Sequence, residues 1–205
     1  MSALSLWKVR VTGENFTAAS INLGPAQRNL DEISLSLPNG VYSTFRTYDY
    51  RKILSLEHHF ARLVESSSLL DKPVEINFTG LRNALRFVLN EIPDCDLRIR
   101  ITLDLEDERG VFYLSTEPLQ VPLPEVYQEG SHAVTYQLQR SNPKAKQTNH
   151  LKTAAKIKSE YGNRINEILM VSPEGIIQEG LSSNFYAVMD GALWTAEQGV
   201  LLGTI

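Results

Sequence analysis

A lysine and a glutamate in the second half of the chain carry side chains suited to chemistry on a bound aldehyde. Lys152 stands at the head of a helical stretch, and Glu179 stands at the end of a later strand. A lysine amine forms a Schiff base with an aldehyde, and a carboxylate can hold a ring nitrogen in its protonated form. An ion pair between that carboxylate and the protonated ring nitrogen, at about 4 Å and an effective dielectric near 20, is worth up to ~4 kcal/mol. The two residues predict pyridoxal phosphate chemistry, against the alternative of a solvated lysine and an exposed glutamate.

The elements that must position these residues are a mixture of helices and strands. Residues 41–55 predict a hairpin, and helices follow from Leu56 and from Thr79, which we expect to be an N-cap. Residues 97–105 alternate with period two and lead through an acidic turn to a partner strand at 111–114. Later come a strand near 132–137, a helix from about 151 to 161, and hairpins turning at 172–175 and 190–191. Because helices and strands do not alternate strictly, the pattern favours an α+β fold.

A proline-rich stretch divides the chain. Pro118, Pro122 and Pro124 favour a stiff, extended connection. We predict an N-terminal α+β domain over residues 1–119, a linker over 120–126 and a C-terminal domain over 127–205.

The composition is that of an ordinary globular chain and excludes several kinds of site. The 205 residues are 42% apolar and 21% charged, with a formal net charge of −4, which gives nucleic-acid binding no support. The single Cys95 excludes an internal disulfide framework, and the four histidines lack metal-ligand spacing. No stretch reaches the roughly 18 apolar residues of a membrane span, and no secretory signal is present, so we expect a cytoplasmic protein without a membrane partner.

Several short segments, in their order and spacing, resemble the class IV aminotransferases. This family includes branched-chain aminotransferases, D-amino acid aminotransferase and aminodeoxychorismate lyase. The resemblance runs from Gly40 to Ile205 and implies a two-domain, D-amino acid aminotransferase-like fold, a cofactor cleft between the domains, bound pyridoxal 5′-phosphate and a homodimer. The matching segments are Gly40-Val41-Tyr42, residues 58–63 with Ser66-Ser67, Lys152, residues 167–169, Glu179-Gly180 with Ser183-Asn184, Asp190-Gly191 with Thr195, and residues 202–204.

The resemblance gives the lysine and the glutamate their roles. It implies that Lys152 holds the cofactor as a Schiff base and, once released, moves a proton between substrate and cofactor. Glu179 is implied to pair with the pyridine nitrogen, with Ser183 and Asn184 supporting that carboxylate or the ring oxygen by hydrogen bonds.

The phosphate of the cofactor has its own implied ligands. Arg62 resembles the arginine that binds it, and the alternative is a helix-surface arginine paired with Glu57 or Glu65. The turn that ends in Thr204 and Ile205 resembles one whose backbone N–H groups bind the phosphate. Class IV enzymes continue past that turn, so we expect the C-terminal domain to be incomplete. His58 and His59 are expected to be packing or capping residues.

Three residues are candidates for substrate binding. Tyr42 matches an aromatic residue that borders the active site in the family, and Arg46 lies on the same face of its strand. Arg100, which shares a face with Arg98, could reach the substrate. The alternative for these arginines is a solvated sheet face. The carboxylate-binding arginine of D-amino acid aminotransferases would align near Leu103 and is absent, which argues against that specificity.

The sequence thus predicts an aminotransferase that moves an amino group between an amino acid and a 2-oxo acid. Two alternatives stay open: a lyase of the aminodeoxychorismate type, which would use the same lysine and cofactor to eliminate pyruvate, and a non-catalytic relative that keeps only the fold.

Overall fold

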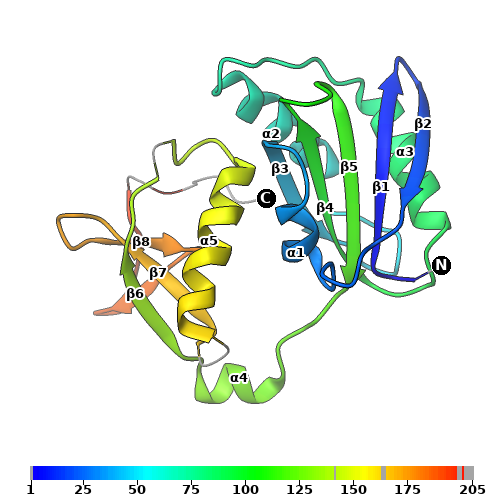
Figure 1. The fold of residues 1–205 in the computed structure, drawn as a ribbon. Coiled ribbons are helices and arrows are strands. Elements are labelled where there is room, and N and C mark those ends of the chain that lie inside the picture. The colour runs from blue at the N-terminus through cyan, green and yellow to red at the C-terminus, as the bar shows by residue number, and fades with distance from the viewer. Residues whose placement is uncertain (1, 141, 163–164, 198–199, 201–205) are drawn as a thin grey trace. The chain divides into compact units, whose positions relative to one another are not determined.

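The chain forms two compact units. The computed structural model describes all residues except 1, 141, 163–164, 198–199 and 201–205 (Figure 1). Unit 1 comprises Met1–Gln120 together with Ala145–Leu151, and unit 2 comprises Val121–Lys144 together with Lys152–Thr204, each with those gaps. The first boundary follows Gln120, at the proline-rich stretch. The second lies inside a helix, so residues 145–151 belong with the first unit, which the predicted domain division did not anticipate.

Unit 1 is built on a five-stranded antiparallel sheet in the order β2-β1-β5-β4-β3. The strands are β1 (Ser5–Thr12), β2 (Asn15–Ile21), β3 (Gly40–Arg46), β4 (Leu97–Asp104) and β5 (Val111–Pro118). The period-two prediction for β4 and its pairing with β5 are confirmed. The β1–β2 hairpin was not predicted.

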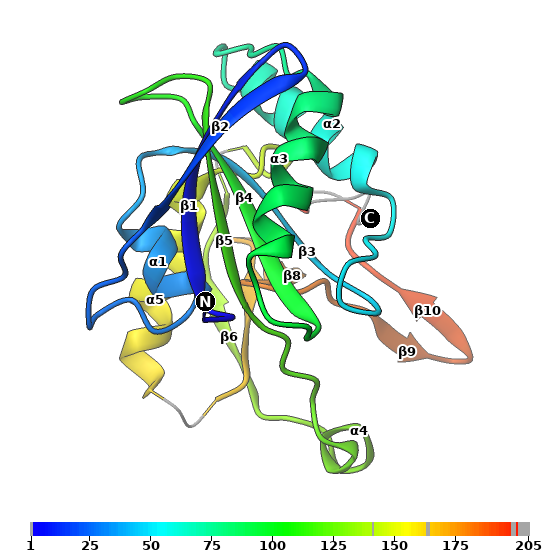
Figure 2. The same ribbon diagram turned by 90° about the vertical axis from the view of Figure 1, so that its right-hand side faces the viewer.

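Different helices pack on the two faces of this sheet. One face packs with α2 (Leu56–Ser68) and α3 (Phe78–Asn90), where Ile99, Ile101 and Leu103 of β4 are fully buried. The other face packs with the short helix α1 (Leu30–Leu35), where Ile33 joins a smaller cluster. Figure 2 shows α2 and α3 on one side of the sheet and α1 on the other. Every second residue of β4, including Arg98 and Arg100, therefore faces the α1 side.

Two local predictions in unit 1 were wrong. The N-cap of α3 is Asn77, whose side-chain oxygen accepts a hydrogen bond from Gly80 N–H at 2.9 Å, so Thr79 lies inside the helix. Residues 41–55 do not form a hairpin, because β3 pairs with the distant β4. In place of the second strand of the predicted hairpin there is one bridge, between Tyr48 and Lys52. It closes a tight turn with positive φ at Asp49 and Tyr50.

Unit 2 has a three-stranded sheet in the order β6-β7-β8, a helix packed on it, and a separate hairpin. β6 and β7 are parallel and joined through α5, whereas β7 and β8 are antiparallel. Ala154 and Ile157 of α5 pack against Ile168 and Met170 of β7. The elements are α4 (Pro124–Glu129), β6 (Ala133–Gln137), α5 (Thr148–Tyr161), β7 (Glu167–Val171), β8 (Ile177–Gly180), β9 (Ala187–Met189) and β10 (Ala192–Trp194).

Both hairpins predicted for unit 2 are confirmed, as β7–β8 and β9–β10. The linker prediction was partly wrong, since α4 begins at Pro124 within the stretch that we expected to be extended. Proline is well tolerated in the first turn of a helix because its missing N–H has no partner there anyway. Among the described residues, no helix is long and apolar enough to cross a membrane.

Candidate active site

Two hydrogen bonds of its backbone hold Lys146 beside β3, an edge strand of the sheet. Tyr42 N–H donates to the Lys146 carbonyl at 2.9 Å, and Lys146 N–H donates to Ser66 Oγ of α2 at 3.2 Å. One step further, Val41 and Gln147 form an antiparallel bridge. Residues 145–148 thus extend the sheet of unit 1 beyond its edge strand.

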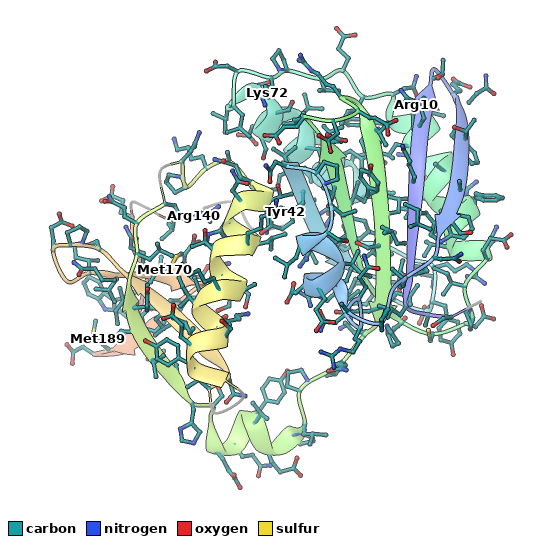
Figure 3. The ribbon with its side chains drawn as sticks, in the orientation of Figure 1. Arg10, Tyr42, Lys72, Arg140, Met170 and Met189 are labelled. Carbon is teal, nitrogen blue, oxygen red and sulfur yellow. The ribbon has the colours of Figure 1, made fainter. Side chains whose placement is uncertain are left out.

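The Lys146 amine lies against the ring of Tyr42. Its Nζ is 5.3 Å from the ring centroid, and Cζ of Arg100 is also 5.3 Å from it. Such cation–π contacts are worth about 0.5–1 kcal/mol when exposed and about 2 kcal/mol when desolvated. Tyr42 is buried (Figure 3). The structure therefore brings a residue predicted to border the substrate together with an amine that the sequence analysis did not consider.

Positive charge gathers around His59, a buried residue of α2. Its Nδ1 lies 2.9 Å from Ser43 Oγ, and its ring packs on Phe45. Burial, followed by the positive charges of Arg62 and Lys146, lowers the pKa of His59 to about 4. The imidazole is therefore neutral at pH 7, and the expectation that His59 is a packing residue is confirmed.

The same charges make this part of unit 1 suited to an anion. Burial lowers the pKa of the half-buried Arg62, opposed by the charge of Glu65. Glu57, the other carboxylate considered as a partner for Arg62, forms an ion pair with Arg82. A site where two cations disfavour a third positive charge has a positive potential, and a phosphate would be stabilised there.

Arg100 fastens α1 to the sheet. It is 2% exposed and donates to four acceptors of unit 1, so at most one of its five N–H groups remains for any ligand. The acceptors are Thr44 Oγ1 at 3.0 Å, the Leu30 carbonyl at 3.1 Å, Ser34 Oγ at 2.6 Å and Asp31 Oδ1 at 2.9 Å. The solvated-face alternative is wrong for Arg100, because α1 covers it.

Arg46, the last residue of β3, already has partners within unit 1. Its Nη2 lies 3.5 Å from a carboxylate oxygen of Asp96, and its guanidinium stacks 4.4 Å from the centroid of the Tyr48 ring. The substrate roles proposed for Arg46 and Arg100 stay predictions, and the geometry supplies other partners for both.

Glu179 is buried on β8 in unit 2 and is ion-paired with Arg140. Arg140 Nη1 donates to Glu179 Oε1 at 2.7 Å, and the two side chains are 9% and 6% exposed. Arg140 is labelled in Figure 3. A carboxylate offers about four acceptor positions, so one such bond does not exhaust it. Arg140 was not singled out in the sequence, because it follows β6 in a polar loop without a periodic pattern.

The turn after Glu179 is tightly packed. A Cβ added at Gly180 would come within 2.3 Å of Ser183 Oγ and 2.9 Å of the Glu167 carboxylate carbon, so a larger residue would require both of these side chains to move. Gly180 N–H donates to the Ser183 carbonyl at 2.8 Å. Ser183 and Asn184 are exposed on this turn, whereas Thr204 and Ile205 lie outside the described residues.

Lys152 lies in the second turn of α5. The buried face of that helix is formed by Ala154, Ile157 and the partly buried Tyr161. At about 100° per residue, Lys152 lies about 200° from Ala154, on the side of α5 away from this buried face. The packing of α5 within unit 2 thus turns Lys152 away from the sheet that carries Glu179.

The sequence matches the family model for class IV amino-transferases over residues 40–205. This match covers most of the chain, and the protein belongs to the class IV aminotransferase family, which uses pyridoxal 5′-phosphate. Its α+β fold is that of the fold type IV transaminases.

Individual relatives agree with this assignment. A Methanocaldococcus jannaschii protein described as "Putative branched-chain-amino-acid aminotransferase" is 26% identical over 186 residues, which are 80% of this chain and 62% of the relative. The chain thus spans less than two thirds of that relative. The crystal structure of a "putative branched-chain amino acid aminotransferase" from Thermotoga maritima has a TM-score of 0.69 at 24% identity, over 98% of this chain and 70% of that one. A "Putative 4-amino-4-deoxychorismate lyase" has a TM-score of 0.65 at 22% identity, over 89% and 70%.

Proposed function

We propose that this protein is a pyridoxal 5′-phosphate-dependent aminotransferase that moves an amino group between an amino acid and a 2-oxo acid. Within a family that uses this cofactor, the observation that carries the proposal is the Lys146 amine, held against Tyr42 in the positive region of unit 1. An amine for the aldehyde and cations for the phosphate are the donors that the cofactor requires.

We assign the amine to Lys146 rather than to Lys152, the residue predicted from the sequence. The Lys146 backbone is fixed on both sides, and its Nζ is placed against an aromatic ring. Lys152 is carried on a helix face turned away from the core of its unit. A covalent role needs a reproducible position for the reacting nitrogen, and the contacts of Lys146 define one.

The remaining residues have distinct tasks. Arg62 would bind the phosphate, to which a guanidinium donates two parallel hydrogen bonds. Glu179 would hold a proton on the ring nitrogen, and Arg140 keeps its carboxylate oriented. When bound, pyridoxal 5′-phosphate supplies the electron sink that a substrate carbanion needs. The Lys146 amine would then move the proton between substrate and cofactor. His59 would not compete for that proton, because its low pKa makes the neutral imidazole a weak base.

The lyase alternative has one observation in its favour, the fold shared with the lyase-like structure described above. The two reactions differ in what they consume. An aminotransferase needs a 2-oxo acid acceptor for turnover, whereas a lyase releases pyruvate without one. Pyruvate formation from aminodeoxychorismate in the absence of any acceptor would overturn the aminotransferase proposal.

The decisive experiment locates the cofactor bond. The native protein is incubated with pyridoxal 5′-phosphate and reduced with borohydride, and its intact mass and peptide map are recorded. We expect one pyridoxyl group on Lys146, lost in Lys146→Ala and retained in Lys152→Ala. A pyridoxyl group on Lys152 would restore the sequence-based assignment. No stable pyridoxyl group on either lysine would support the non-catalytic relative.

A further inference from the structure

We propose that Thr148 is a positioning residue for the Lys146 amine, acting through the pairing of residues 146–148 with the edge of β3. This inference rests on the proposed role of Lys146. Thr148 touches neither substrate nor cofactor in the proposed function, and its effect runs entirely through the backbone of its neighbours.

The Thr148 hydroxyl replaces the pair of backbone hydrogen bonds that would join two residues of an antiparallel sheet. Its Oγ1 accepts a hydrogen bond from Gly40 N–H at 2.9 Å and donates one to the Gly40 carbonyl at 3.3 Å. The side chain is 1% exposed, so no water replaces these bonds. Loss of the hydroxyl would leave a buried donor and a buried acceptor without this partner.

These bonds complete one consistent antiparallel register. Tyr42 pairs with Lys146, Val41 with Gln147, and Gly40 with Thr148. Residues directly opposite each other in an antiparallel pair project to the same face, which places the Lys146 side chain beside Tyr42. A slip of one residue would turn Lys146 to the other face of the sheet. Thr148 therefore sets the face on which the amine is presented.

Gly40, to which Thr148 is hydrogen-bonded, is itself tightly packed. Gly40 is packed so closely against β4 that an added Cβ would lie 1.9 Å from the Leu103 carbonyl oxygen. Thr148 is also the first residue of α5, so one hydroxyl fixes both the register of the edge segment and the start of the helix. Gly40 and Thr148 are 108 positions apart, so this is a tertiary contact that no local pattern reveals.

Variants of matched threonines test the proposal. Thr148→Val removes the hydroxyl and keeps the shape, and Thr148→Ser restores the hydroxyl. Thr116→Val is the control, because Thr116 is also fully buried in unit 1, and its hydroxyl donates to the Ala3 carbonyl and bonds Ser5 Oγ, both at 2.8 Å. It lies on β5, which is separated from β3 by β4.

Two readouts are recorded on the full chain: the rate of pyridoxyl incorporation at Lys146 with pyridoxal 5′-phosphate and borohydride, and the hydrogen exchange of the Tyr42 amide without cofactor. Thr148→Val is expected to slow incorporation and to speed exchange, each by about tenfold, the scale of one lost buried hydrogen bond. Thr148→Ser is expected to restore both. Thr116→Val is expected to change neither, although it loses as many hydrogen bonds.

The two readouts separate this proposal from the proposed function. If the wild-type protein carries no pyridoxyl group at Lys146, the assignment of the amine fails, whatever the exchange shows. If Lys146 is labelled but Thr148→Val leaves both readouts at the wild-type or Thr116→Val level, the positioning role of Thr148 is overturned while the assignment of Lys146 stands.

Discussion

Among the described residues, Arg100 in unit 1 and Arg140 in unit 2 are largely buried arginines with a carboxylate partner, but the two pairs are built differently. In unit 1, Arg100 donates to three neutral oxygens and to Asp31, whose side chain is 51% exposed. In unit 2, Arg140 meets Glu179, and neither side chain is more than 9% exposed. The first arginine fastens a helix to a sheet, whereas the second pairs with a buried carboxylate.

The two arginines differ in whether a contribution to stability explains their burial. A fully buried ion pair is weak evidence for stability, since apolar residues of similar size often serve as well. Stability alone therefore does not explain the largely buried ion pair at Glu179. Packing alone explains Arg100, because this residue of β4 donates to acceptors on α1 and β3.

The largest expected effect is that of Arg140→Met. It leaves the Glu179 carboxylate buried without this cation, which typically costs about 3–5 kcal/mol. The core of unit 2 is small, with five buried residues among those described, so we expect faster hydrogen exchange throughout β6, β7 and β8 and little change in β4. Glu179→Gln added to Arg140→Met should recover much of the loss, because it removes the buried charge that lost its cation. A double variant no more stable than the single one would contradict the comparison.

Acid should affect unit 1 through a different group, the neutral and buried His59. Its pKa is about 4 in the folded protein, below the ordinary value of 6.5, so between these values the unfolded chain binds more protons. Stability is therefore greatest above pH 6.5 and declines as the pH falls toward 4. The difference in pKa corresponds to a loss of up to about 3 kcal/mol.

Urea unfolding at pH 7 and at pH 4.5, followed by exchange of β4 amides, measures this loss. In His59→Gln the part of the pH dependence that comes from His59 should disappear. His132→Gln is the control, because His132 is exposed and lies in unit 2. Equal pH dependence in the wild-type protein and in His59→Gln would show that His59 titrates normally.

The next effect is that of Arg100→Met, for which we expect a loss of about 2 kcal/mol. Ser34, Thr44 and the Leu30 carbonyl lose a donor, but the half-exposed Asp31 can be solvated. The larger core of unit 1 should keep the sheet folded, with faster exchange confined to α1. A loss as large as that of Arg140→Met, spread over the whole sheet, would erase the contrast between the two arginines.

The sequence predicted the period of β4 and missed the cover of its second face. Alternation places Arg98 and Arg100 on one face, but α1 has only six residues and too short an apolar pattern to predict a covering helix. Arg100 was therefore interpreted as a substrate ligand or a solvated residue. The N-cap at Asn77 was missed for a related reason, since Asn77 and Thr79 are both capable caps two residues apart.

The proposed assignment of the amine to Lys146 rests on the same kind of non-local information. Five lysines lie between residues 144 and 158, and helical periodicity draws attention to Lys152 at the head of α5. What sets Lys146 apart is its pairing with a strand more than 100 residues earlier, which is non-local and leaves no mark in a window of neighbouring residues. The family segments and both late hairpins were predictable, because their signals are local.

The smallest expected effect is that of Thr102→Val in unit 1. Thr102 lies on β4 directly opposite Tyr42, is fully buried, and its hydroxyl has no hydrogen-bond partner among the described residues. Thr102→Val should therefore stabilise unit 1, by about 1 kcal/mol or less, because an unsatisfied polar atom is replaced by a methyl group. Thr116→Val, which breaks two buried bonds in the same sheet, should destabilise it. Urea midpoints of the two variants decide the matter. If Thr102→Val proved as destabilising as Thr116→Val, its hydroxyl would have a partner in solution, and the face of β4 shared with Arg100 would be more polar than its contacts indicate.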